Sequence, residues 1–242
     1  MYQERAYQRI SGAKDLVGFE VEVKETHLWI QAERDLSAAA RQVVIRLRDE
    51  LESYICHRPE FATSLQPLSP SPFAPPIVQL MISSAQAAKV GPMAAVAGAM
   101  AELVGKELAS LSKEMIVENG GDIFLQSARP RVVKVYAGVS PFSDRLGLKV
   151  KSGGEPLGIC TSAGRVGPSL SLGVADAAVI LANSPALADA VATRMGNRVQ
   201  RREDIPVALK VARSIPGVRG ALLIVGEGLG AWGELEILRL EE

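Results

Sequence analysis

The chain opens with a pattern of alternating apolar and charged residues. Phe19, Val21 and Val23 alternate with Glu and Lys, which is the two-residue period of a half-buried strand, and the pattern predicts one strand over residues 19–33. Asp35 then offers an N-cap, and apolar residues follow at helical spacing until Pro59 ends the helix. The first quarter of the chain is therefore expected to be a strand followed by a long amphipathic helix.

A proline-rich segment at about 59–76 interrupts this pattern. It holds six of the 14 prolines of the chain. Such a density predicts a long surface loop, with a partner-binding segment as the alternative. After it, Gly91-Pro92 begins a helix. Most faces of this helix carry small side chains, because Ala and Gly flank its apolar stripe. That helix can lie close to a sheet or to a ligand.

Short apolar runs and two further helices fill the rest of the chain. Ser184-Pro185 is an N-cap followed by proline at the first helical position, and that helix is expected to end near Gly196. A second helix is expected over 204–215. Strands before, between and after paired helices predict an α+β fold. The predicted strands are 115–117, 123–126, 132–137, 146–150, 157–160, 177–182, 218–225 and 235–240.

Composition excludes several classes of protein. The chain has 242 residues, with Lys+Arg 27 and Asp+Glu 27, so no bulk charge draws it to nucleic acid or to an anionic membrane. Two cysteines exclude a disulfide scaffold and fit a reducing compartment. The first residues lack the apolar core of a signal peptide, and no apolar stretch is long enough to span a bilayer. We expect a cytoplasmic protein without nucleic-acid or membrane partners, and a homo-oligomer stays open.

The first candidate site interrupts a strand pattern with two glycines. Bare N–H groups in such a kink form a concavity that binds anions, and a ligand can approach the backbone closely there. Polar side chains flank the glycines and would add contacts to a ligand. The alternative is a tight turn between two strands. The candidate binding residues are Asn119, Gly120, Gly121 and Asp122.

A hydroxyl-rich segment that follows the strand predicted to end at Cys160 is the second candidate. Hydroxyl groups, backbone N–H groups and Arg165 together suit a phosphate group, and the alternative is a flexible polar loop. Cys160 itself is a candidate nucleophile or sulfur carrier if Arg165 or a helix N-terminus lowers its pKa; the alternative is a small buried thiol. The candidate phosphate contacts are Thr161, Ser162, Ser169 and Ser171.

The third candidate is a pair of oxygen ligands on the helix that Ser184 opens. Asp189 and Thr193 are four residues apart, so their side chains lie on one helix face, one turn from each other. A carboxylate and a hydroxyl are ligands that Mg²⁺ takes when substrate phosphates and water complete its shell. The alternative is a solvated Asp189 and a Thr193 hydroxyl bonded to its own helix backbone.

These motifs, in this order, resemble the ApbE superfamily, and the chain looks closest to a short branch of it. Its best-understood members are magnesium-dependent FAD:protein FMN transferases. The resemblance covers about residues 90–195. The segments that carry it are I-V-E-N-G-G-D-I (116–123), S-L-S-L-G-V-A-D-A-A-V (169–179) and S-P-A-L-A-D-A-V-A-T (184–193), the last being the most specific.

The resemblance implies a single ApbE-like domain over 1–242, α+β in class. It is built from two T-fold-like halves of mostly antiparallel sheets packed with helices, with the nucleotide between the halves. It implies Mg²⁺ held by Asp189, Thr193 and a backbone carbonyl near Ala94, and FAD or FMN as the flavin. The Gly-Gly-Asp segment would lie at the flavin pocket. The chain departs from the transferases at Ala97-Gly98-Ala99, where they carry a Lys and an aromatic residue, and at Pro168, near which they carry a His.

Three functions follow from this resemblance. The first is binding of a flavin or a related phosphorylated nucleotide with Mg²⁺, with transfer of FMN from FAD to a threonine of an acceptor protein as the reaction. The second is a cytoplasmic role in sulfur assimilation and homocysteine formation without flavin transfer, in which Cys160 would handle sulfur. The third is a nucleotide-binding module without turnover.

Overall fold

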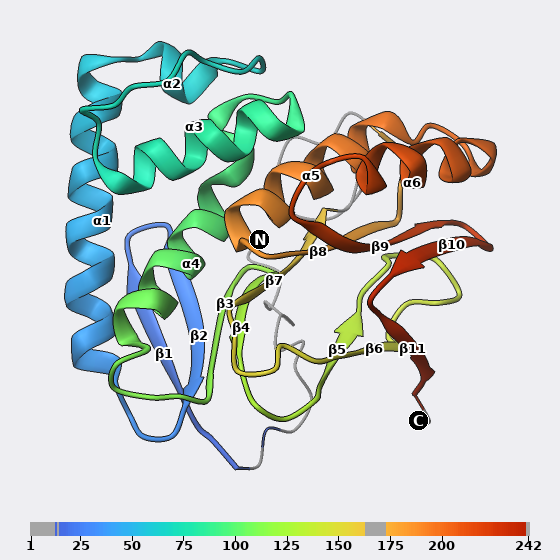
Figure 1. Cartoon of the computed structure of the whole chain (residues 1–242), viewed down its shortest axis with the longest axis horizontal. Coiled ribbons are helices and arrows are strands. Elements are labelled where there is room, and N and C mark those ends of the chain that lie inside the picture. Colours follow the sequence, from blue (N-terminus) through green and yellow to red (C-terminus); the bar gives the residue numbers. More distant parts are fainter. Residues whose placement is uncertain (1–12, 14, 163–172, 241–242) are drawn as a thin grey trace.

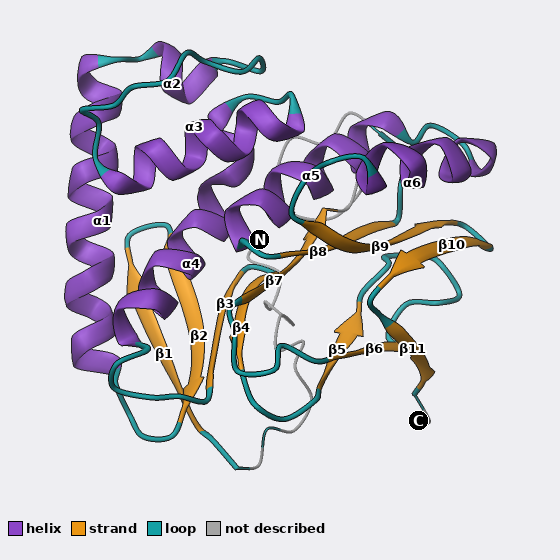
Figure 2. Ribbon diagram, viewed as in Figure 1, coloured by secondary structure: helices purple, strands orange, loops and turns teal. Residues whose placement is uncertain are grey.

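The computed structural model describes residues 13, 15–162 and 173–240 (Figure 1). Most helices lie together on one side of a long, twisted sheet, and three strands lie beyond its other side (Figure 2). The helices are α1 (Ser37–His57), α2 (Glu60–Thr63), α3 (Pro76–Ala88), α4 (Val96–Leu108), α5 (Pro185–Arg198) and α6 (Ile205–Arg213), with 3-10 turns η1 (Pro92–Ala95) and η2 (Arg202–Asp204).

The larger sheet has eight strands, all paired antiparallel, in the order β1-β2-β3-β4-β7-β8-β9-β10. A second sheet of three strands has the order β11-β6-β5. The strands are β1 (Val17–Val23), β2 (Thr26–Ala32), β3 (Met115–Asn119), β4 (Asp122–Gln126), β5 (Arg131–Val135), β6 (Leu146–Val150), β7 (Leu157–Ser162), β8 (Ala177–Ala182), β9 (Val218–Val225), β10 (Gly228–Gly233) and β11 (Glu236–Arg239).

The eight-stranded sheet is covered on both faces, which explains its continuous apolar runs. Val117 and Phe124 point into the core shared with the helices, whereas Ile116 and Ile123 point into the core shared with the smaller sheet. Every residue of β8 is buried for the same reason. Alternation along a strand therefore assigns each residue either to the helix face or to the face that packs against the second sheet.

The expected α+β class with mostly antiparallel sheets is confirmed, and several boundaries are corrected. The strand predicted over 19–33 is a hairpin of two strands, β1 and β2, which turns at Lys24 with a φ of 52°. The proline-rich segment contains the short helix α2, and α3 begins at Pro76. Strand β10 was not predicted, because its three glycines hide the strand pattern.

Among the described residues, no single helix is long and apolar enough to span a membrane. Helix α3 and the segment Pro92–Leu108 together have the length and composition of a span, but the two are bent by 103° relative to each other.

Candidate functional site

Three of the predicted site residues lie side by side on the helix face of the sheet. Asn119 at the end of β3 pairs with Asp122 at the start of β4, and Asp122 pairs with Cys160 of β7. Because side chains alternate along a strand, all three lie on the same face of the sheet as Val117 and Phe124, which pack against the helices. Strand register, which the sequence alone does not reveal, therefore gathers an amide, a carboxyl and a thiol under the helix layer.

Gly120 and Gly121 form the two-residue turn of this hairpin. Their φ angles are 63° and 107°, a region that residues with a side chain seldom adopt. This is the tight turn that the sequence offered as the alternative to a ligand-binding kink. The same turn brings Asn119 and Asp122 opposite each other at the edge of the helix layer.

Asp189 of α5 comes to this site from the helix layer. Its Oδ2 accepts a hydrogen bond from the backbone N–H of Gly98 at 2.9 Å, in the first turn of α4. The N-cap residue of α4, Ala95, offers no side-chain cap, so Asp189 satisfies a backbone donor that would otherwise lack an acceptor. The two helices approach closely here, since a Cβ on Gly98 would lie 2.3 Å from the carbonyl oxygen of Pro185.

The start of α4 is also tied to the sheet. The Asn119 side chain donates from Nδ2 to the carbonyl oxygen of Ala97 at 3.2 Å. One peptide segment, Ala97-Gly98, thus joins the β3–β4 turn to α5. The carbonyl groups of Ala94 to Ala97, in which the resemblance places one metal ligand, lie at this same junction.

The electrostatics of the cluster disfavour negative charge without a cation. Burial, and then the charge of Asp122, raise the pKa of Asp189 well above its usual range, while the N–H groups of Gly98 and Ala97 act in the opposite direction. No cationic side chain of the described residues lowers it. A buried carboxyl group beside a second carboxyl group is a favourable environment for a bound cation, because a cation reverses the penalty.

Cys160 is placed in an environment that opposes the thiolate. The residue is fully buried, and its Sγ lies 3.3 Å from the carbonyl oxygen of Pro185. Burial, and then the charges of Asp122 and Asp189, raise the pKa of the thiol well above its usual value. A nucleophilic or sulfur-handling role was conditional on a lowered pKa, and this geometry instead agrees with the alternative, a small buried thiol.

The donor set around Asp189 fits Mg²⁺ better than a transition metal. Thr193 lies one turn along α5 from Asp189 and is partly exposed. Within the described ranges, no three side chains of His, Cys, Asp or Glu gather in a group that could hold a metal. Carboxylate, hydroxyl and carbonyl oxygens are hard ligands, and few of them come from the protein where phosphate and water complete the shell.

In the hydroxyl-rich candidate segment, Thr161 and Ser162 point to opposite faces of the sheet. Ser162 ends β7 on the helix face and is buried, whereas Thr161 pairs with Val179 on the opposite face. Thr161 is therefore turned away from Asp122 and Cys160. Ser169 and Ser171 lie outside the described residues, as do Arg165 and Pro168.

Two residues at the site carried too little signal to be singled out from the sequence. Gly98 is one small residue among several in its helix, yet only a residue without a Cβ lets Pro185 and Asp189 approach so closely. Glu102, 1% exposed on α4, accepts from the Ser184 hydroxyl at 2.5 Å and from the backbone N–H of Ala186 at 3.2 Å. It fixes the first turn of α5 and so helps to orient Asp189.

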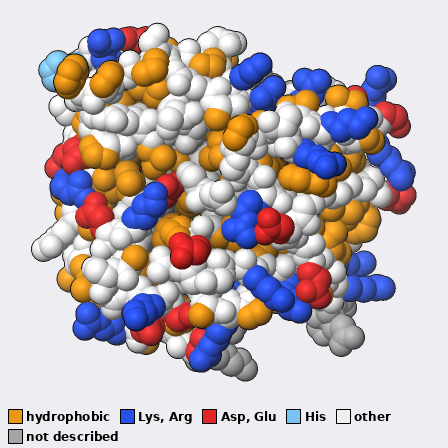
Figure 3. All heavy atoms as spheres, in the orientation of Figure 1, with side chains coloured by type: hydrophobic (Ala, Val, Ile, Leu, Met, Phe, Trp, Pro, Cys, Tyr) orange, Lys and Arg blue, Asp and Glu red, His pale blue; other side chains and the backbone are white. Residues whose placement is uncertain are grey.

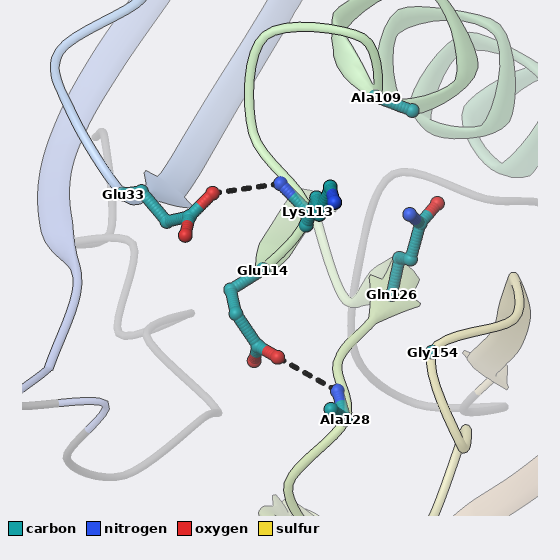
Figure 4. Close-up of a pocket in the computed structure, with 7 residues that line it drawn as sticks. All are labelled: Glu33, Ala109, Lys113, Glu114, Gln126, Ala128 and Gly154. Atoms are coloured by element: carbon teal, nitrogen blue, oxygen red, sulfur yellow. Dashed lines mark hydrogen bonds between the residues drawn. The ribbon is translucent and has the colours of Figure 1, made fainter.

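A separate depression lies at the other end of β3 and β4. It has a volume of 560 Å³, and Glu33, Lys113, Glu114 and Gln126 are among its lining residues (Figure 4). The Glu33 and Glu114 carboxylates accept the backbone N–H groups of Lys113 and Ala128. These hydrogen bonds hold the loops in place, and no predicted site residue lines the depression.

Comparison with known sequences identifies relatives along most of the chain. A family model described as "AbpE bacteria" matches residues 8–218. A UPF0280 protein of Methanosarcina barkeri is 41% identical over 217 residues, which is 88% of this chain and 85% of the relative. A UPF0280 protein of Methanosarcina acetivorans is 41% identical over 224 residues, covering 91% of this chain and 88% of the relative.

The solved structures that share this fold include flavin transferases. A mutant of the flavin transferase ApbE from Vibrio cholerae aligns with a TM-score of 0.58 at 16% identity, over 90% of this chain and 97% of that chain. The apo form of the flavinyl transferase ApbE from Pseudomonas stutzeri aligns with a TM-score of 0.58 at 14% identity, over 90% and 94% of the two chains. At these identities the likeness establishes the shared fold.

Proposed function

Because the chain belongs to the AbpE bacterial family and has the fold of the ApbE flavin transferases, we propose that it binds a flavin nucleotide together with Mg²⁺ where α4 meets α5. The observation that carries this proposal is the contact between the Asp189 carboxylate and the N–H of Gly98, 2.9 Å long, beside Asp122. It brings a carboxylate with a raised pKa next to the carbonyl groups that begin α4.

The residues that would hold the metal are Asp189, Thr193 and a carbonyl of the α4 start, near Ala94. When bound, Mg²⁺ neutralises charge on the nucleotide phosphates and orients them. Asn119 and Asp122 flank this position from the sheet, and Gly120-Gly121 allows close approach at the turn. These residues bind and position the ligand, and they require no covalent intermediate on the protein.

The reaction proposed for this site is transfer of FMN from FAD to a protein threonine. The threonine Oγ forms a bond to the FMN phosphorus, and the bond from that phosphorus to the bridging oxygen breaks. The hydroxyl proton passes to solvent and AMP leaves. Positioning and charge neutralisation suffice for such a transfer, because phosphoryl transfer needs little covalent work from the enzyme.

Release of AMP tests this reaction. The purified chain is incubated with FAD, Mg²⁺ and a threonine-containing acceptor, and AMP is followed by chromatography. Asp189→Asn removes the carboxylate charge, and Asp204→Asn on η2 serves as a matched control away from the site. Release that depends on Mg²⁺ and on Asp189 supports transfer. FAD binding without AMP release would instead identify a nucleotide-binding module without turnover.

The role in sulfur assimilation receives no support from the geometry. It would require a thiolate at Cys160, and the structure buries that thiol close enough to Asp122 and Asp189 for their charges to oppose the thiolate. We therefore do not extend the proposed function to sulfur transfer.

A further inference from the structure

Buried arginines in this protein normally have carboxylate partners. Arg131 is 7% exposed and pairs with Asp15 at 2.7 Å. The partly buried Arg48 pairs with Glu25 at 2.5 Å, and Arg219 pairs with Glu234 at 2.6 Å. Pairing of this kind offsets the cost of taking a guanidinium group out of water.

Arg194 of α5 breaks this rule. Its side chain is partly buried, yet no carboxylate of residues 13, 15–162 or 173–240 pairs with it. Its charged neighbour is Arg198, one helical turn further along, which also lacks an acidic partner in the same ranges.

The chain next to this turn does not supply the missing acid. The backbone re-enters the described structure beside the end of α5, where the N–H of Val174 donates to the carbonyl oxygen of Val199 at 3.0 Å. The segment that leads to it, residues 163–172, contains no Asp or Glu. Arg198 lies in the last turn of α5, where the helix dipole favours a cation, but Arg194 lies a full turn earlier.

Positive side chains extend from this turn over the neighbouring surface. Figure 3 shows Lys and Arg side chains gathered over the region in which Figure 1 places α5 and α6. The exposed cations of α5, η2 and α6 and of the residues between them are Arg198, Arg201, Arg202, Lys210 and Arg213, of which Arg201 is paired with Asp204. The potential of such a surface attracts anions and favours their arrival at a partly buried guanidinium.

We propose that Arg194 and Arg198 form a phosphate-binding pair on α5. Two guanidinium groups one turn apart can share the oxygens of one phosphate, and partial burial strengthens such charge-assisted hydrogen bonds. Arg194 directly follows Thr193 and lies about 7.5 Å along the helix axis from Asp189. Five residues turn an α-helix by about 140°, so the Arg194 side chain points to a different side of α5 from that of Asp189. The phosphate is therefore either a free anion or part of a ligand that extends around α5. The pair itself requires neither a flavin nor a metal.

Binding of phosphate compounds to the full chain in the presence of a chelator tests the pair without the metal. The probes are inorganic pyrophosphate, FMN and riboflavin, which has the same ring system as FMN but no phosphate. Calorimetric titrations compare the wild type with Arg194→Gln and Arg194→Lys, and with Arg34→Gln as an exposed control. We expect Arg194→Gln to weaken binding of a phosphate-bearing probe by roughly tenfold or more. Arg194→Lys should weaken it partly, and Arg34→Gln should have no effect.

The probes separate the two sources of phosphate. Weakening for FMN alone identifies the nucleotide phosphate, and weakening for pyrophosphate alone identifies a free anion. Weakening for both shows that the pair binds phosphate from either source. Unchanged affinities in Arg194→Gln, equal losses for riboflavin, or no phosphate binding by the wild type would each overturn the proposal. None of these outcomes depends on Asp189, so the failure of this pair and the failure of the proposed function remain distinguishable.

Stability provides an independent readout. In chloride buffer without phosphate, Arg194→Gln should melt at the temperature of the wild type or above it, because the variant removes a partly buried charge that has no acidic partner among the described residues. Phosphate should raise the melting temperature of the wild type more than that of the variant. A variant that melts well below the wild type without phosphate would show that Arg194 serves the fold, and this too would overturn the proposal.

Discussion

The Asp189 carboxylate on α5 caps the first turn of α4 by accepting the N–H of Gly98 at 2.9 Å. The two residues are 91 positions apart in the chain. This contact ties the two helices together and places a carboxylate beside the carbonyl groups at the start of α4. The candidate site therefore depends on helix packing as much as on the chemistry of its side chains.

Gly98→Ala should destabilise the protein and disrupt the site together. Its Cβ would lie 2.3 Å from the Pro185 carbonyl oxygen and 2.8 Å from the Asp189 Cβ, so the helices must separate. Overpacking of this kind costs about 1–3 kcal/mol. Chemical denaturation should show this loss of stability.

Ala101→Gly, within the same helix, is the control, because it changes helix propensity without overpacking. Gly120→Ala is not a suitable control because Gly120 has a positive φ. Equal stability of Gly98→Ala and wild type would contradict the close approach of the two helices.

Asp189→Asn should keep or raise the stability of the ligand-free protein at neutral pH. The folded state disfavours the ionised carboxyl because its pKa is raised, so stability falls as pH rises through the unfolded value of 3.8. Asn removes this penalty and still offers an oxygen to the N–H of Gly98. Thermal melting at pH 7 provides the measurement.

Asp204→Asn is the matched control for that variant. The pKa of Asp204 is lowered, first by the backbone N–H of Gln200, so its ionised form is favoured by folding. Its replacement should lower the melting temperature where Asp189→Asn does not. A clear loss of stability in Asp189→Asn would mean that the Asp189 charge is already compensated.

Cys160 should resist alkylation in the folded protein at pH 7, because its thiol is buried and its pKa is raised. The chain contains its own control, since Cys56 is free and exposed. Mass spectrometry after iodoacetamide treatment should find the label on Cys56 alone, and on both cysteines after denaturation. Rapid labelling of Cys160 in the native protein would revive a thiolate role.

Acid should weaken the link between the N-terminal region and β5. Arg131 holds the pKa of Asp15 at about 2, from an ordinary value of 3.8, through a hydrogen bond and its charge. Because this pKa is lowered by folding, the pair's contribution to stability is complete above pH 3.8 and is lost as the pH falls through about 2. Denaturation curves between these pH values should show a weaker pH dependence in Arg131→Gln than in the wild type. Identical pH dependence in both proteins would contradict the pairing.

Much of the fold could be predicted from local patterns. The strand over Ala177–Ala182 and the helix after Ser184 were expected because a continuous apolar run and an N-cap followed by proline are strong local signals. The hairpin of β1 and β2 was missed because its turn residues, Lys24 and Glu25, include no Gly, Asn or Pro, which are the usual turn signals. Strand β10 was missed because its glycines lack the side chains that reveal a strand.

The candidate site was predictable only in part. The i, i+4 spacing of Asp189 and Thr193 revealed one helix face, and the Gly-Gly motif revealed a turn. Asp122 lies opposite Cys160 because of the register between β4 and β7. These two strands are neighbours in the sheet but are separated along the chain by β5 and β6, which belong to the second sheet. The partner of Asp189, a backbone N–H on another helix, leaves no trace in the sequence.

Calorimetric titration of the chain with FAD, in the presence and absence of Mg²⁺, tests the central claim most directly. We predict binding that is strong with Mg²⁺ and at least roughly tenfold weaker without it, and loss of this difference in Asp189→Asn. No heat of binding in either condition, or the same affinity in wild type and Asp189→Asn, would contradict a magnesium-dependent flavin site at the junction of α4 and α5.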